Sequence, residues 1–188
     1  MEKFDTYVLM LSQTFPAKHP KAGKPTGFAE KVQEALNYVE YFGTVGMLPT
    51  KCAKIHTMRT NCDMWAKRFE KIYAGKACLS LRVWSGKPYH SKQIEIARLT
   101  KDDGIGLQFV YVTDINFNDS YIDMNMVVVG EYPRGCCQLM PKFTENQIVN
   151  GRVLAANDGL TLQDCLPFFR GHNMMKPLVI IHFTPFRY

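Results

Sequence analysis

The order of the apolar segments along the chain constrains the fold more than any other feature of the sequence. Segments with the alternation typical of strands are separated, at irregular intervals, by segments with helical spacing. We expect strands at residues 7–14, 77–84, 93–99, 107–112, 124–129 and 178–183, and helices at 28–39, 62–73, 147–156 and 161–169. A regular alternation of strands and helices would predict a parallel, doubly wound sheet. The irregular order instead predicts an α+β fold, with a mixed sheet curled into a barrel and helices packed outside it.

The length and composition of the chain predict a single domain over residues 1–188. Of the 188 residues, 46% are hydrophobic and 21% are charged, so the chain can bury a core and does not have a disordered composition. No apolar stretch approaches the roughly 20 residues that a membrane helix needs, so we expect no membrane partner. Apart from the strand expected at 124–129, the pattern of residues 114–145 is harder to interpret. The oligomeric state is left open.

The cysteines predict reduced thiols in a cytoplasmic protein. There are six of them: Cys52, Cys62, Cys78, Cys136, Cys137 and Cys165. None forms a C-x-x-C pair, and no histidine pair follows at the spacing of a zinc site. The first apolar run is too short for a signal peptide and has no basic flank. We therefore expect a cytoplasmic protein without a metal or cofactor, and the adjacent pair of Cys136 and Cys137 has no interpretation.

The net charge makes a polyanionic partner possible without requiring one. The formal charge is +6 at pH 7. A basic protein favours nucleic acid because each contact with a phosphate releases counterions. A charge that serves only solubility is an equally good interpretation, so the local clusters of residues have to decide.

The first cluster runs from Lys54 to Arg59 and places a lysine, a threonine and an arginine within six residues. It precedes a helix that we expect Asn61 to cap, and the N–H groups at a helix start favour anions. Lys54 and Arg59 suit phosphate, while Thr57 could be a nucleophile or bind an oxyanion. In a straight strand Thr57 and Arg59 share a face, so Lys54 joins them only if the backbone bends. The alternative is the solvated, basic end of a strand.

The second cluster combines aromatic residues with cations around the turn that follows residues 77–84. Arg82 and Trp84 share one face of that expected strand, and Lys87 and Tyr89 follow in the turn. Proteins that bind single-stranded RNA stack bases on aromatic rings and contact phosphates with such cations. The alternative is a core tryptophan beside a charged edge.

The third cluster lies between the last two expected helices, where Asn157, Asp158 and Gly159 precede Thr161. A carboxylate at Asp158 could reach a cleft as a general acid or base. Asn, Asp and Gly also favour turns, so the alternative is an ordinary connection between helices. The five histidines are scattered without metal-ligand spacing, and we expect most of them to be structural or exposed.

Together these clusters resemble the ASCH family of the PUA-like group. The family signature is a lysine, an acidic or hydroxyl residue three positions on, and an arginine two further, which Lys54, Thr57 and Arg59 match. Cys52 stands where the family usually has a glycine. Other stretches are similar to bacterial ASCH-like proteins of the Bacteroides type: residues 9–16, 86–89, 157–160 and 180–184. Residues 114–145 have no clear match to the family, and we expect them to be a variable insertion. The resemblance implies a PUA-like β-barrel with flanking helices, and RNA binding.

The resemblance also implies a set of catalytic residues. One bacterial branch of the family is an amidohydrolase that removes the acetyl group from N4-acetylcytidine with a lysine, a threonine and a glutamate. These positions match Lys54, Thr57 and Asp158, whose carboxylate is one methylene shorter. Thr57 would be the nucleophile, Lys54 would assist its deprotonation, and Asp158 would pass the proton to the leaving amine.

Arg59 would orient the substrate or support this site. Other family members are ribonucleases, which would use the same cleft on a phosphodiester. Our first expectation is a basic cleft around Lys54, Thr57 and Arg59 that binds RNA or a modified nucleoside. Hydrolysis of the nucleoside amide or of RNA is the alternative.

Overall fold

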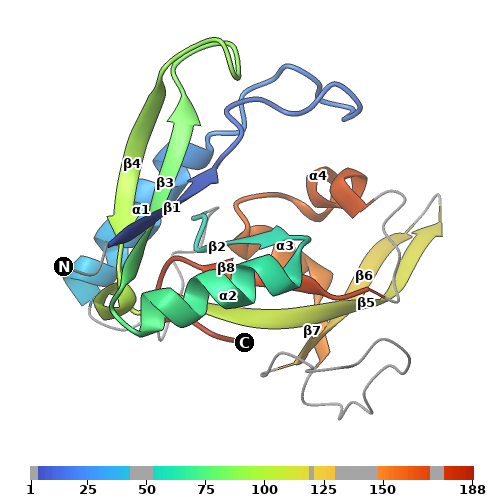
Figure 1. The fold of residues 1–188 in the computed structure, drawn as a ribbon. Helices are drawn as coiled ribbons and strands as arrows, with labels where there is room; N and C mark the ends of the chain where they lie inside the picture. Colours follow the sequence, from blue (N-terminus) through green and yellow to red (C-terminus); the bar gives the residue numbers. More distant parts are fainter. Residues whose placement is uncertain (1–3, 43–52, 119–120, 130–147, 170–175) are drawn as a thin grey trace.

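The computed structural model describes residues 4–42, 53–118, 121–129, 148–169 and 176–188. The α+β class is confirmed (Figure 1). The strands are β1 (Asp5–Met10), β2 (His56–Arg59), β3 (Ala77–Trp84), β4 (Gln93–Leu99), β5 (Gly106–Asn118), β6 (Tyr121–Val129), β7 (Ile148–Asn150) and β8 (Leu178–His182). The helices are α1 (Phe28–Phe42), α2 (Cys62–Tyr73), α3 (Gly151–Asn157) and α4 (Leu162–Cys165), with the short 3-10 helices η1 (Lys101–Asp103) and η3 (Leu166–Phe169).

The strands form two sheets, a three-stranded one with the order β1-β3-β4 and a five-stranded one with the order β2-β8-β5-β6-β7. β1 runs parallel to β3 and the other pairs of named strands are antiparallel, so the expected mixture of directions is confirmed. In the described ranges the two sheets remain separate and do not close into one barrel. None of the helices seen there is long and apolar enough to span a bilayer.

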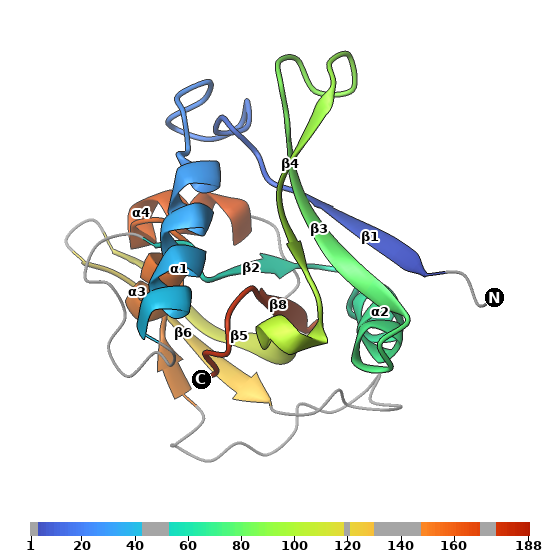
Figure 2. The same cartoon turned by 90° about the vertical axis from the view of Figure 1, so that its left-hand side faces the viewer.

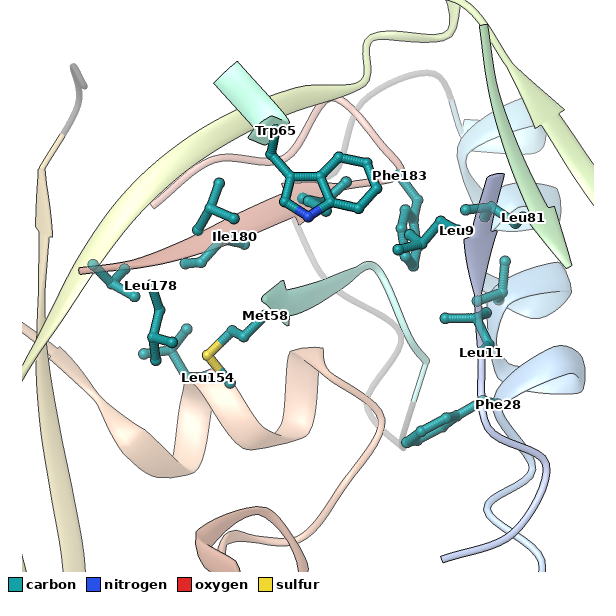
Figure 3. Close-up of a cluster of buried hydrophobic side chains, with 14 of the residues drawn as sticks. Leu9, Leu11, Phe28, Met58, Trp65, Leu81, Leu154, Leu178, Ile180 and Phe183 are labelled. Atoms are coloured by element: carbon teal, nitrogen blue, oxygen red, sulfur yellow. The ribbon is translucent and has the colours of Figure 1, made fainter. Parts of the chain in front are cut away.

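The core fills the space around the central β2–β8 pair, and helices lie on both sides of it (Figures 1 and 2). Helix α2 buries one side chain every three or four residues, which is the spacing of one helix face: Cys62, Trp65, Phe69 and Ile72. Figure 3 shows Trp65 of α2 on one side of β8, while Met58 of β2 points toward Leu154 of α3 on the other. The β2–β8 pair is therefore fixed from two directions, which gives the residues next to it a rigid support.

Several predicted boundaries need correction. The helix expected at residues 147–156 begins as strand β7, and α3 starts only at Gly151. Asn150 explains this start, because its side chain accepts a hydrogen bond from Arg152 N. Asn61 precedes α2 as expected, but its φ of 59° places it in the left-handed region and its side chain makes no cap hydrogen bond. The first strand ends at Met10 rather than at residue 14.

Part of the expected insertion continues regular structure. Residues 114–118 and 121–129 belong to the antiparallel β5–β6 pair, which extends well past the end of the predicted strand at 112. Residues 130–147, with Cys136 and Cys137, lie outside the described residues, so the insertion stays a prediction.

The segment before β2 is joined to the connection between α3 and α4, and this junction positions the candidate site. Lys54 and Asp158 form an isolated β-bridge, and Ile55 N donates to Asn157 O at 2.9 Å. Gly159 follows with a φ of +74°, and a Cβ there would lie 3.1 Å from the Cβ of Lys54. Glycine is thus required at this close approach, both for its backbone conformation and for its lack of a side chain.

Candidate functional site

A cavity of about 260 Å³ lies against the start of β2, the α3–α4 connection and η3. It brings together the side chains that the first and third clusters of the sequence singled out: Lys54, Thr57, Arg59 and Asp158. Phenylalanine residues line it as well: Phe28, Phe168 and Phe169. Lys54 and Thr57 do converge on one cavity, and Lys54 stands in its bridge to Asp158 before β2 begins at His56.

Lys54 and Asp158 form a buried ion pair at this cavity. The side chain of Lys54 is only 1% exposed, and its Nζ donates to Asp158 Oδ1 and, at 3.0 Å, to the main-chain oxygen of Asp158. The ammonium also lies 4.1 Å from the ring centroid of Phe28. Burial lowers the pKa of Lys54 and raises the pKa of Asp158, although their mutual attraction opposes both shifts. The two pKa values approach each other, so proton transfer within the pair costs less than it would in water.

Thr57 and Arg59 share one face of β2, as the strand periodicity predicts. Arg59 Nη1 donates to Thr57 Oγ1 at 2.8 Å and to Met58 O at 2.9 Å, while Nη2 donates to Met10 O at 3.1 Å. The guanidinium is therefore held between β2 and the end of β1. Because Thr57 Oγ1 accepts a bond from a cation, negative charge that develops on this oxygen would be stabilised.

Two histidines beside the ion pair were missed by the sequence reasoning. Register pairs His56 of β2 with His182 of β8, and both residues are fully buried. Burial lowers the pKa of His56 well below its usual value, and burial together with Arg187 lowers the pKa of His182 to about 3. Both rings are therefore neutral near pH 7. Only the pairing of β2 with β8 brings them together, and that pairing has no local signal in the sequence.

The second cluster is not part of the cavity. Trp84 and Tyr89 line a separate groove of about 340 Å³, formed with residues 10–14, and their ring centroids are 5.3 Å apart. Arg82, on β3, binds Ser80 and the carboxylate of Glu95 on β4. Lys87 lies in the exposed turn beyond β3. Of the residues expected to bind a ligand, Arg59 lines the cavity, Trp84 and Tyr89 line the groove, and Arg82 and Lys87 line neither.

Neither a metal nor a cysteine explains the cavity. Within the described ranges, no group of three or more His, Cys, Asp or Glu side chains could hold a metal ion. Cys165 lines the cavity, but burial raises the pKa of its thiol, which keeps it protonated and weakly nucleophilic. Thr57, whose oxygen accepts a hydrogen bond from the Arg59 guanidinium, is the candidate nucleophile that has a cation beside it.

Comparison with known proteins leaves the family of this chain open. No protein-family model, curated protein or solved structure matches it. Function is therefore inferred from the residues and distances of the site itself.

Proposed function

We propose that the cavity is the active site of an amidohydrolase that acts on N4-acetylcytidine or a related acylated nucleoside. The observation that carries the proposal is the buried pair of Lys54 and Asp158, at a cavity that Thr57 also lines. A buried ion pair adds little net stability, because the loss of hydration offsets the attraction between the charges. Ionisable groups with shifted pKa values in a cavity are typical of catalytic sites.

The shifted pKa values suit both proton transfers that the reaction needs. In the proposed first step, Thr57 Oγ1 attacks the acetyl carbon and its proton passes to neutral Lys54. As the C–N bond breaks, protonated Asp158 donates its proton to the leaving amine of cytidine. Water then attacks the acetyl ester on Thr57: charged Asp158 takes a proton from the water, Lys54 returns its proton to the oxygen of Thr57, and the ester C–O bond breaks. Acetic acid leaves and ionises in solvent, and both side chains are back in their starting states. Arg59 supports the oxygen of Thr57 throughout, and burial lowers the cost of moving a proton from Lys54 to Asp158, which forms the neutral pair that begins the cycle.

The dimensions of the cavity favour a small substrate. Its volume of about 260 Å³ lies just below the range of roughly 300–1,000 Å³ that is usual for sites that bind small molecules. A modified base with its acyl group matches this size, and a folded RNA does not. The rings of Phe28, Phe168 and Phe169 offer apolar surface for such a base.

The same residues support a family relation as part of this proposal. The Lys54, Thr57 and Arg59 run and the α+β architecture fit an ASCH-like protein, although the two sheets of the described residues do not close into the barrel of that family. The buried free thiols of Cys62, Cys78 and Cys165 suit a protein of the cytoplasm, where thiols stay reduced.

Product analysis tests the proposed activity. Purified protein is incubated with N4-acetylcytidine, and the products are identified by mass spectrometry. We expect cytidine and acetate from the wild type, and a loss of at least about 100-fold in rate in Lys54→Met and in Thr57→Val. Lys71→Met is the matched control, because Lys71 forms a 2.8 Å ion pair with Asp5 on the surface. Intact substrate in every sample, or equal rates in Lys54→Met and Lys71→Met, would rule the proposal out.

The groove beside Trp84 supports RNA binding as a second candidate function. Tyr89 is 87% exposed, although its ring lies next to Trp84. Its φ of 65° is a conformation that residues with a side chain rarely adopt, and such strain is often retained at functional sites. The exposed ring of Tyr89 and the half-buried ring of Trp84 could stack a base of single-stranded RNA, and Lys87 could contact its phosphate.

Fluorescence anisotropy with a labelled RNA oligonucleotide tests this second candidate. We expect binding that weakens with salt and a loss of about 1–3 kcal/mol in binding free energy for each of Trp84→Ala and Tyr89→Ala. Binding that does not change in these two variants would exclude the groove. Cleavage of the RNA that requires Lys54 would instead favour a ribonuclease.

A further inference from the structure

A chain of polar side chains behind the ion pair runs from Asn157 back to the carboxylate of Asp158. Asn157 Nδ2 donates to the hydroxyl of Tyr188 at 2.8 Å, and the same hydroxyl lies 2.8 Å from His56 Nε2. His56 Nδ1 is buried and has no hydrogen-bond partner in the part of the chain that the structure describes. This nitrogen lies 3.9 Å from Oδ1 of Asp158.

The donors in this chain determine where the proton on His56 resides. The Nδ2 group of Asn157 can only donate, so the oxygen of Tyr188 accepts from it. The hydroxyl proton of Tyr188 is then directed to His56 Nε2, the other hydrogen-bond partner of this hydroxyl among the described residues, and Nε2 accepts it. A neutral imidazole that accepts at Nε2 carries its proton on Nδ1. The nitrogen that carries this proton is the one 3.9 Å from Oδ1 of Asp158.

We infer that Tyr188 is a positioning residue, which fixes His56 as the Nδ1–H tautomer and thereby directs an N–H dipole at Asp158. The dipole favours the charged form of Asp158 once it has given up its proton. His56 thus acts on the carboxylate without taking part in proton transfer itself. This role in catalysis rests on the proposed amidohydrolase function, whereas the tautomer of His56 does not.

The surroundings keep both partners in the protonation states that this arrangement needs. Burial lowers the pKa of His56 well below its usual value, and neighbouring His182 and Lys54 lower it further, so the ring stays neutral. Burial raises the pKa of Tyr188, so the phenol keeps its proton. Other titratable groups also act on this series of side chains: Arg59 acts on Asp158, and Cys165 acts on Tyr188.

Tyr188 is held in place independently of His56. Gln108 of β5 accepts a hydrogen bond from Tyr188 N at 2.9 Å and donates through Nε2 to Tyr188 O at 3.1 Å. The ring of Phe186 packs edge-on against the ring of Tyr188, with centroids 5.0 Å apart. The five-stranded sheet therefore holds the hydroxyl of Tyr188 in a fixed position next to His56.

Nitrogen NMR of uniformly 15N-labelled protein tests the inference without an activity assay. The protonated and the bare nitrogen of a neutral imidazole have well-separated 15N shifts, and a His56→Gln variant assigns the signals of His56. We expect Nδ1 to be protonated in the wild type and a mixture of the two tautomers in Tyr188→Phe. Tyr73→Phe is the matched control, because its hydroxyl accepts from Leu107 N at 3.2 Å. Protonation at Nε2 in the wild type, or an unchanged tautomer in Tyr188→Phe, would overturn the inference.

Asn157→Asp provides a second test, which reverses the chain of donors. A carboxylate at 157 can only accept, so Tyr188 would donate to it and His56 Nε2 would donate to Tyr188. We expect the tautomer of His56 to change to Nε2–H, and retention of Nδ1–H would contradict the proposed order of donors.

Kinetics separates this inference from the proposed function. If the wild type hydrolyses N4-acetylcytidine, we expect Tyr188→Phe to lower kcat about 10- to 100-fold, with KM within about twofold of the wild type, because one oriented group supplies part of the acid–base contribution. An unchanged kcat would refute the catalytic role of Tyr188. A wild type that has the Nδ1–H tautomer but no activity would refute the proposed function and leave the assignment of the tautomer intact.

Discussion

Asp158→Asn removes the charge that compensates Lys54, and its cost can be worked out from the burial of the pair. Breaking a buried ion pair costs about 3–5 kcal/mol of unfolding free energy, because the remaining charge stays in the interior. Lys54 can escape this cost by losing its proton. Because pH 7 lies about 3.5 pH units below the ordinary lysine pKa of 10.5, removing this proton costs about 4.8 kcal/mol. The asparagine still offers an oxygen to Nζ, so we expect a loss near 3 kcal/mol.

The dependence on pH provides the internal check. If Lys54 is neutral in the folded variant and charged in the unfolded chain, the unfolded state binds one more proton. The stability of Asp158→Asn then rises with pH, by up to about 1.36 kcal/mol per unit, until the pH reaches 10.5. At pH 7 the charged form, at about 3 kcal/mol, costs less than deprotonation, whereas at pH 9 deprotonation costs only about 2 kcal/mol. Urea denaturation at pH 7 and pH 9 should therefore show a deficit, relative to the wild type, that shrinks by about 1 kcal/mol.

Lys71→Met is again the control, and we expect its midpoint in urea to match that of the wild type, since a solvent-exposed pair contributes little. The reasoning would be refuted by an Asp158→Asn variant as stable as this control. A deficit that does not change between pH 7 and pH 9 would also contradict it.

Three other perturbations have expected outcomes. His182 has a pKa of about 3 in the fold and 6.5 when unfolded, so stability falls as pH drops below 6.5. Between pH 7 and pH 5 we expect the unfolding free energy of the wild type, measured in urea titrations, to fall by about 2 kcal/mol more than that of His182→Phe. Equal decreases in the two proteins would contradict this. Leu154 is fully buried against Met58. Leu154→Ala should therefore lower the unfolding free energy by about 2–5 kcal/mol, and a loss below about 1 kcal/mol would show a poorly packed core. Tyr89→Gly should raise the unfolding free energy, measured in urea, by about 1 kcal/mol, because glycine adopts a φ of 65° without strain. A decrease would argue against strain at this turn.

The elements with strong local patterns were predictable from the sequence. Helix α2 and strands β3 and β4 have the predicted bounds, because the apolar spacing in each of them is regular and a glycine or a polar turn ends it. Strand β7 was not predictable from local pattern. Its three residues are at most half-buried, and their pairing with β6 defines the strand. Residue propensity cannot report such a distant partner.

The candidate site was predictable in its residues but not in its connections. The sequence singled out Lys54 and Asp158 separately, and the fold joins them across 104 positions of the chain. His56 and Tyr188 were missed, because 132 positions separate them and only the strand register brings them together. The placement of Trp84 and Tyr89 in a separate groove likewise depends on how the strands pair.

The most direct test of the central claim is to identify the residue that carries the acetyl group during turnover. Wild-type protein is mixed with N4-acetylcytidine under single-turnover conditions, quenched in acid, digested and examined by peptide mass spectrometry. We predict an acetyl group on Thr57, and none on that peptide in Thr57→Val. Cytidine release without acetylation of Thr57, or an acetyl group on Lys54 instead, would contradict the proposed chemistry of this site.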